Sequence, residues 1–301
     1  MIIISGPDRI DFLQRLTTNN LARLAGDQAI ITILCNPQGR ILDILTVYET
    51  ENHLHVLTLP ARGQETTTFF KNRIFFMDKV DVQNESAAFL QYQVQGPHLE
   101  KILAALSMRE MLQKHTRNQI TIEGYEVNIV GRIGGEDNSV RLVAPAQAQT
   151  ALATVLNELG VKEMSSLTHE ILQVESGIGS VKNELTEEYT PLEIGLADFV
   201  ARDKGCFPGQ EVLARQLSYD KITRHLVGIM MEKDPGKYQR LKFEGGNIGQ
   251  MTTSVNSPRF GHIGLAVVRR PYHEIGTSVE LFDKHSETVI PASIVALPFE
   301  K

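Results

Sequence analysis

The chain has 301 residues, of which 42% are hydrophobic and 22% are charged, as in globular proteins of two or three domains. Its formal net charge of −6 argues against general nucleic-acid binding, which needs a basic surface. No apolar run approaches the roughly 20 residues of a membrane span, and the first residues lack a signal-peptide pattern. We therefore expect a cytoplasmic protein without a membrane partner.

The first part of the chain predicts a strand, a helix, further strands and another helix. Pro7 suits the start of a helix, and the apolar residues that follow recur at helical spacing. Two runs rich in β-branched residues flank the turn sequence Asn36-Pro37-Gln38-Gly39, which predicts a hairpin. The predicted elements are strands at 1–4, 28–35, 40–49 and 53–60 and helices within 5–16, capped by Ser5 or Asp8, and at 64–75.

A second series with a similar order begins near residue 86. Gly96-Pro97 precedes an apolar pair, Ile102-Leu103, at the same offset at which Gly6-Pro7 precedes Phe12-Leu13. We interpret this as a distant internal duplication. Chance similarity is the alternative, because Gly-Pro often precedes a helix. The predicted elements of this series are strands within 87–94, 120–130 and 139–145 and helices at 95–106 and 146–159.

The last third changes character. One more helix is predicted over residues 166–177, and a polar loop over 180–190. From residue 222 on, only short strands separated by turn residues are indicated, which is typical of a small all-β domain, here a barrel. We therefore predict three domains, with limits at 1–85, 86–221 and 222–301.

The sequence KGCFPGQE, from Lys204 to Glu211, contains one of only two cysteines. Gly205 and Gly209 permit turns closed to other residues, and helix formers follow from Gln210 on. A helix N-terminus and the charge of Lys204 would both favour the thiolate of Cys206.

Two alternatives remain open at this motif. A free cysteine often acts as small apolar filler. Local physics leaves that choice undecided for Cys206, whereas we expect filler for Cys35, which lies in a predicted strand. Two cysteines cannot build a four-ligand zinc site, so no metal is expected.

The motif KGCFPGQE resembles the KGC-x-x-GQE signature of YgfZ-type proteins, which are relatives of the glycine-cleavage T-protein. Further segments are similar to this family in the family's order, so that the resemblance covers nearly the whole chain. They are SGPDRIDFLQRLTTNNL, NPQGRILDILTV, QGPHLEKIL, QVESGI, PLEIGLADFV, IGQMTTSVNSP and IGLAVVRR.

The resemblance implies an α+β protein in which duplicated ferredoxin-like units form a folate-binding T-protein-like fold, followed by a small C-terminal β-barrel. It implies tetrahydrofolate, or a one-carbon derivative, as the cofactor. It also implies an accessory role in iron–sulfur cluster assembly or repair, with iron–sulfur client or assembly proteins as partners. The sequence does not decide whether such a protein is an enzyme.

The resemblance also assigns residues. Glu175 in QVESG stands where the superfamily has a pterin-binding glutamate, and the alternative from local sequence is the exposed end of a helix. Cys206 matches the signature cysteine, with Lys204 as its charged neighbour and candidate catalytic partner. Arg215 either neutralises a folate carboxylate or pairs with Glu211 on one helical face. The remaining motif residues are Gly205, Gly209, Gln210 and Glu211.

Two departures from the family pattern matter. The signature usually has tyrosine where this chain has Phe207. Catalytic T-proteins use an aspartate in the region that corresponds to LPARGQETTTFF, where Glu65 is the only acidic residue here. This counts against aminomethyl transfer without excluding it. The alternatives to the accessory role are therefore a tetrahydrofolate-dependent one-carbon transferase and a ligand-free scaffold that acts by protein contact.

Overall fold

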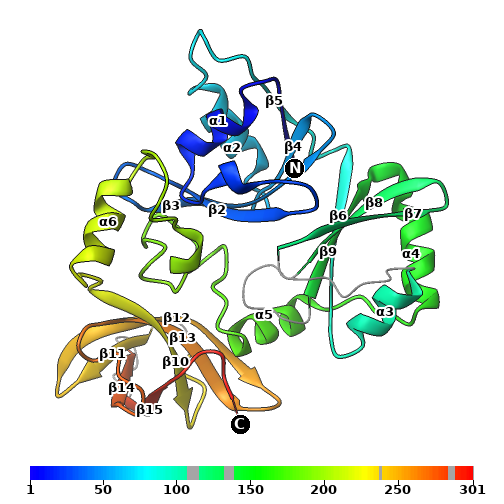
Figure 1. The fold of residues 1–301 in the computed structure, drawn as a ribbon. Helices are drawn as coiled ribbons and strands as arrows, with labels where there is room; N and C mark the ends of the chain where they lie inside the picture. Colours follow the sequence, from blue (N-terminus) through cyan, green and yellow to red (C-terminus); the bar gives the residue numbers. More distant parts are fainter. Residues whose placement is uncertain (107–114, 132–138, 237–238, 284–288, 301) are drawn as a thin grey trace. The chain divides into compact units, whose positions relative to one another are not determined.

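The computed structural model describes residues 1–106, 115–131, 139–236, 239–283 and 289–300, and its chain forms two compact units (Figure 1). Unit 1 consists of Met1–Cys35, Asp43–Glu163 and Phe199–Pro208. Unit 2 consists of Asn36–Leu42, Met164–Asp198 and Gly209–Lys301. The units interleave along the sequence, and the predicted domain limits stay a prediction.

The first half of unit 1 is a five-stranded sheet with two helices. The strand order is β2-β3-β4-β1-β5, and β1 is antiparallel to both of its neighbours, β4 and β5. Phe12 of the first helix and Phe70 of the second are buried and meet edge to face at 6.1 Å. The elements are β1 (Ile2–Ser5), α1 (Arg9–Leu16), β2 (Ala29–Cys35), β3 (Ile41–Thr50), β4 (His53–Leu57), α2 (Gly63–Lys71) and β5 (Asp81–Asn84).

The second half of unit 1 is a four-stranded sheet with the order β6-β9-β8-β7. Leucines of α3 and α4 pack with the strand residues Val94, Ile129 and Leu142 in one buried cluster, so these helices cover one face of the sheet. The elements are β6 (Phe89–Gln95), α3 (Leu99–Ala105), β7 (Arg117–Ile122), β8 (Tyr125–Gly131), β9 (Ser139–Pro145) and α4 (Gln149–Glu158).

The two sheets of unit 1 are joined by buried side chains and have a similar order of elements. A smaller cluster joins Tyr48 and Leu57 of the first sheet to Val130 and Val143 of the second. In each half the first strand is antiparallel to the last strand of the following meander, β4 or β9. In each half a glycine with positive φ, +100° at Gly6 and +135° at Gly96, accepts a backbone hydrogen bond at the start of the helix. These shared features agree with the predicted duplication.

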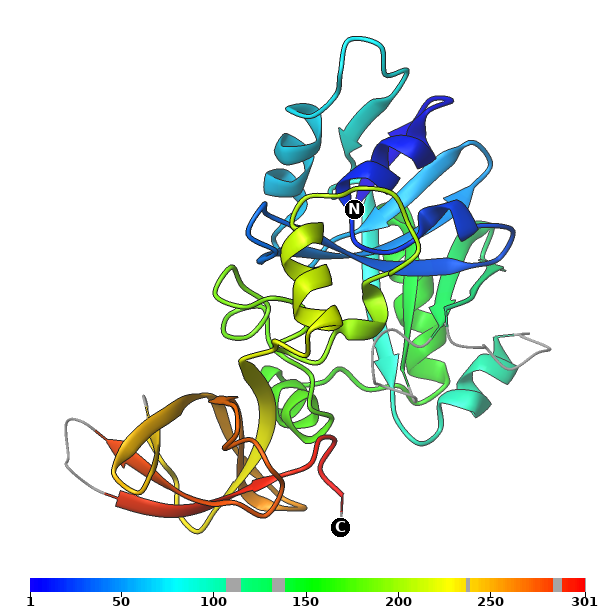
Figure 2. The ribbon, with the colours of Figure 1, turned by 60° about the vertical axis from the view of Figure 1, so that its left-hand side comes forward.

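Unit 2 contains the C-terminal barrel and two helices, α5 (Ser166–Glu175) and α6 (Gln210–Ser218). Six antiparallel strands close in the order β10-β13-β12-β11-β14-β15, which confirms the predicted barrel (Figure 2). Val174 of α5 packs with Val255, Ile263 and Phe299 beside the barrel. The strands are β10 (Arg224–Met231), β11 (Gln239–Phe243), β12 (Gly246–Ser257), β13 (Gly261–Arg269), β14 (Ser278–Asp283) and β15 (Val289–Val295).

Some predicted boundaries differ from the structure. The helix predicted over residues 64–75 ends at Lys71, where the Asn72 N–H bonds the Thr68 carbonyl and closes the last turn. The strand β5 was not predicted, because its four residues DVQN carry only one apolar side chain. Among the helices of the described residues, none is long and apolar enough to cross a membrane.

Candidate functional site

Lys204 anchors the KGCFPGQE loop to the end of α1 in unit 1. Its Nζ donates hydrogen bonds to the carbonyl oxygens of Gln14 at 2.7 Å, Asn19 at 2.9 Å and Thr17. Carbonyls at the C-terminal end of a helix lack intrahelical partners and attract cations. Burial lowers the pKa of Lys204 to about 8, so the ammonium form still predominates at pH 7.

Further contacts fix the chain on both sides of the cysteine. The Thr18 hydroxyl donates to the Phe199 carbonyl at 2.7 Å, and the Ala201 N–H donates to the Thr18 carbonyl at 3.0 Å. The Phe207 side chain is buried, and its ring centroid lies 5.1 Å from Lys204 Nζ. An anchored residue therefore stands on each side of Cys206.

The two cysteines have opposite environments. Cys206 is exposed, so its sulfur is reachable from solvent. Cys35 is buried in β2, and burial raises the pKa of its thiol to about 12. Cys35 is a buried apolar core residue, as its position in a predicted strand indicated. The anchored loop supports the interpretation of Cys206 as a presented thiol, and its predicted activation stays a prediction.

The glycines of the motif differ in what they do. Gly209 is the N-cap of α6 and has a φ of +83°, and a Cβ at this position would lie 2.6 Å from Gly39 Cα and 2.8 Å from the Asn36 carbonyl oxygen. Both the backbone conformation and the close approach of the hairpin turn therefore require glycine here. Gly205 is exposed, has no positive φ and has open space where a Cβ would be, so sterics alone do not require glycine there.

The first turns of α6 hold the remaining motif residues. Gln210 is the first residue of the helix. Arg215 pairs with Glu211 at 2.9 Å, four residues apart, as one of the two predicted alternatives states. Both side chains are exposed, so the pair contributes little stability. The proposed contact of Arg215 with a folate carboxylate stays a prediction.

Glu175 is the last residue of α5 and is only 5% exposed. Its Oε1 accepts a hydrogen bond from Ser257 Oγ at 2.6 Å, and its Oε2 accepts one from Arg259 at 3.1 Å. Its backbone carbonyl accepts from the Phe299 N–H at 2.8 Å. The alternative of an exposed helix end is therefore wrong, because the barrel covers this end of α5.

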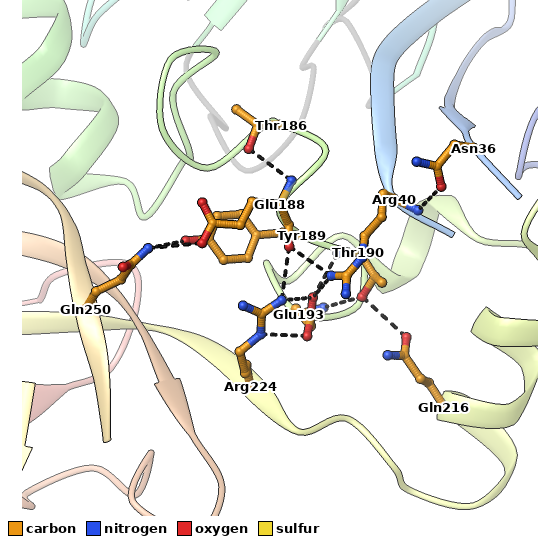
Figure 3. Close-up of polar contacts among 10 residues, drawn as sticks. All are labelled: Asn36, Arg40, Thr186, Glu188, Tyr189, Thr190, Glu193, Gln216, Arg224 and Gln250. Carbon is orange, nitrogen blue, oxygen red and sulfur yellow. Dashed lines mark hydrogen bonds and ion pairs between the residues drawn. The ribbon is translucent and has the colours of Figure 1, made fainter. Parts of the chain in front are cut away.

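A second buried carboxylate, Glu193, was missed by sequence reasoning (Figure 3). Its Oε1 accepts from Arg224 Nε at 2.8 Å, while its Oε2 accepts from Arg224 and Arg40 at 3.0 Å each and from the Thr190 N–H at 2.9 Å. We call these four residues the Glu193 network. Burial opposes ionisation of Glu193, but the hydrogen bonds and charges of the network hold its pKa below the ordinary value.

Side chains around the Glu193 network extend it within unit 2. The Arg224 guanidinium lies 5.0 Å above the Tyr189 ring, and Gln250 of β12 donates to the Tyr189 hydroxyl at 3.0 Å and to Glu188 at 3.1 Å (Figure 3). Arg40 and Glu193 lie in the family segments NPQGR and PLEIG, which were the sequence signal for these residues. The ion pair between them could not be predicted, because the two residues are 153 positions apart.

The segment that corresponds to the T-protein aspartate contains no buried acid. Glu65 is exposed and binds Arg62 at 2.7 Å. The buried acid beside this segment is Asp43 of β3, which accepts from the Thr66 hydroxyl at 2.6 Å and from the Leu59 N–H at 3.0 Å. Burial raises the pKa of Asp43 to about 6. Sequence reasoning did not identify Asp43.

The predicted site residues are divided between the units. Lys204, Gly205 and Cys206 lie in unit 1, whereas the other predicted residues, namely Glu175, Gly209, Gln210, Glu211 and Arg215, lie in unit 2. Over the described ranges, no cluster of three metal-ligating side chains is formed.

Comparison with known proteins covers almost the entire chain. Residues 1–204 match the GCVT N-terminal domain, and residues 224–301 match the glycine cleavage T-protein C-terminal barrel domain. An aminomethyltransferase of Caldanaerobacter subterraneus subsp. tengcongensis is 32% identical, over 93% of this chain and 77% of that protein. An aminomethyltransferase of Thermoanaerobacter pseudethanolicus is 30% identical, over 100% of this chain and 83% of that protein.

The fold is also similar to a solved structure. The glycine cleavage system aminomethyltransferase T of Bartonella henselae matches with a TM-score of 0.84 and 21% identity, over 99% of this chain and 83% of that chain. This likeness concerns the fold alone. It agrees with the expected T-protein-like architecture and its closed barrel.

Proposed function

Because the chain belongs to the glycine-cleavage T-protein family, we propose that it binds tetrahydrofolate and acts in one-carbon transfer of the aminomethyltransferase type. Aminomethyltransferases of this family use tetrahydrofolate as the one-carbon carrier. The observation that carries the proposal for this chain is the buried carboxylate of Glu175, held at the end of α5 by Ser257 and Arg259.

The chemistry of Glu175 suits a pterin. The amino group and the adjacent ring N–H of a pterin are donors that one carboxylate can accept together, as it accepts two parallel bonds from a guanidinium. A carboxylate that is already fixed by neighbours loses little rotamer freedom when it accepts them. We therefore assign pterin recognition to Glu175.

A second candidate is an accessory role in iron–sulfur cluster assembly or repair, of the YgfZ type. It is favoured by the exposed Cys206, held between the anchored Lys204 and the buried Phe207. It is also favoured by the exposed position of Glu65, which makes that acid a poor substitute for the T-protein aspartate. One thiol cannot retain a cluster that normally takes four protein ligands, so only a transient contact with iron would be involved.

Titration calorimetry with tetrahydrofolate tests the common part of both candidates. We expect saturable binding by the purified chain. The absence of any binding heat would support the ligand-free scaffold instead. Exchange of Glu175 for glutamine should weaken this binding. The same exchange at the exposed Glu170, on the same helix, serves as a control that should bind normally.

The substitution Cys206→Ser separates the two candidates. In cells that lack this protein, the accessory role predicts loss of iron–sulfur enzyme activity while the purified variant still binds tetrahydrofolate. A transferase that works without the thiol predicts full complementation. Cytoplasmic localisation is part of either proposal.

A further inference from the structure

The side chain of Glu175 has acceptor capacity that its neighbours do not use. A carboxylate offers about four lone-pair positions. In the part of the chain that the structure describes, Ser257 occupies one position on Oε1 and Arg259 one on Oε2. One acceptor position on each oxygen therefore remains, in a side chain that is 5% exposed.

The hydroxyl of Ser257 can only be the donor in its hydrogen bond with Glu175. Its Oγ accepts the backbone N–H groups of Arg259 at 2.9 Å and Phe260 at 3.1 Å. With both lone pairs engaged, the hydroxyl hydrogen is left to be donated, and Glu175 Oε1 lies 2.6 Å away. This arrangement requires Oε1 to be the acceptor of the Ser257 hydroxyl, which fixes the direction of this hydrogen bond.

The side chain of Arg259 is largely exposed but has an aromatic neighbour. Its guanidinium lies 4.8 Å from the Phe260 ring centroid, in cation–π range. The Phe260 ring contacts Phe299 at 5.9 Å, and the Phe299 N–H binds the Glu175 carbonyl. The turn at Ser257–Phe260 thus supplies both donors to Glu175 and is itself packed against the residue that caps α5.

We propose that Ser257 and Arg259 are positioning residues for ligand recognition by Glu175. They hold its carboxylate in one rotamer, and they leave one acceptor position on each oxygen for the amino group and ring N–H of a pterin. The inference rests on the proposed folate function and adds to it the residues that preform its recognition site.

Substitutions of Arg259 test this inference by calorimetry with tetrahydrofolate. Arg259→Gln should weaken binding about tenfold, because it removes the charge-assisted hydrogen bond that holds Glu175 Oε2 in place. Arg259→Lys keeps a charged donor but loses the planar group that lies against Phe260, so its binding should be tighter than that of Arg259→Gln and weaker than that of the wild type. Arg269→Gln removes the same charge from an exposed position of the barrel and should bind like the wild type.

Ser257→Ala removes the neutral donor and should weaken binding by a smaller factor, about threefold. The separate ring fragment tetrahydropterin should show the same losses as tetrahydrofolate, because the contact is to the ring. If Arg259→Gln lowers the melting temperature by several degrees, Arg259→Met replaces it, since a methionine retains the apolar contact with Phe260.

The outcomes separate this inference from the proposed function. No binding by the wild type would overturn the proposed function. Binding that Glu175→Gln leaves intact would overturn the assignment of Glu175 and the inference with it. Weak binding by Glu175→Gln, combined with equal or tighter binding by Arg259→Gln relative to Arg269→Gln, would overturn the inference alone.

Discussion

Glu193 and Glu175 are buried carboxylates of unit 2, with exposures of 3% and 5%, but they differ in the number of hydrogen bonds that they accept. Glu193 accepts four hydrogen bonds, three of them from two arginines. Among the residues that the structure describes, Glu175 accepts two from side chains, one from a serine and one from an arginine that is 59% exposed. A saturated carboxylate can only hold the fold together, whereas a half-saturated one can also bind a ligand.

A third buried carboxylate of unit 2, Glu184, is intermediate in the number of hydrogen bonds that it accepts. It is fully buried and accepts three hydrogen bonds, from the Ser180 N–H and hydroxyl and from the Thr253 hydroxyl. The three carboxylates therefore form a series in which a Glu→Gln exchange should cost progressively less stability, while the effect on ligand binding is confined to Glu175.

The largest expected effect on stability is that of Glu193→Gln. Removing one partner of a buried ion pair leaves the arginines without their counter-charge, and we expect a loss of about 3 kcal/mol in the free energy of unfolding. Urea denaturation followed by circular dichroism measures it. A loss below about 1 kcal/mol would show that solvent already screens the Glu193 network.

The same residue predicts a pH dependence of stability. A carboxyl group with a lowered folded-state pKa binds its proton more readily when unfolded, so it stabilises the fold above its ordinary pKa of 4.5 and loses this effect as the pH falls further. Stability of the wild type should therefore decline more steeply below pH 4.5 than that of Glu193→Gln. Parallel slopes in acid urea titrations would argue against the network as the cause.

Glu184→Gln should have an intermediate effect. The amide of glutamine retains one acceptor oxygen. Its NH₂ group replaces the other oxygen and would face a donor of Ser180 or Thr253 without accepting from it. We expect a loss of about 1–2 kcal/mol by urea denaturation. A loss as large as that of Glu193→Gln would mean that the number of hydrogen bonds does not order the series.

The smallest effect on stability is expected for Glu175→Gln. Within the described residues its one charged partner, Arg259, is more than half exposed, so water can solvate the guanidinium when the charge of Glu175 is removed. Thermal unfolding should therefore change little. A large loss of stability would assign Glu175 a structural role like that of Glu193.

The thiols offer a comparison on a smaller scale. Because Cys206 is exposed while burial raises the pKa of Cys35 to about 12, iodoacetamide at pH 7 should alkylate Cys206 much faster. Mass spectrometry of the modified chain measures the two rates. Equal rates would contradict the interpretation of Cys206 as a presented thiol.

Local sequence patterns predicted much of the fold. The strand–Gly-Pro–helix repeat, the hairpin at Asn36–Gly39 and the C-terminal barrel all depend on periodicity and turn residues close in sequence. The short edge strand β5 carries too little apolar pattern to be recognised, and its pairing with β1 depends on residues about 80 positions away.

The site was predictable only where single residues carry a family signature. Glu175 and Cys206 were identified in this way, but their supporting residues were not. Glu193 draws its partners from positions 40 and 224, and Glu175 draws its partners from positions 257 and 259. Such long-range polar contacts depend on how distant segments pack, and no local spacing encodes them.

The central claim is that unused acceptor capacity at Glu175 serves a pterin. Its most direct test is calorimetric titration of tetrahydrofolate into Glu175→Gln and Glu184→Gln, which place the same chemical change at two buried positions. We predict that Glu175→Gln weakens binding at least tenfold with its melting temperature preserved, while Glu184→Gln binds normally despite lower stability. Equal affinities of the two variants would contradict the account.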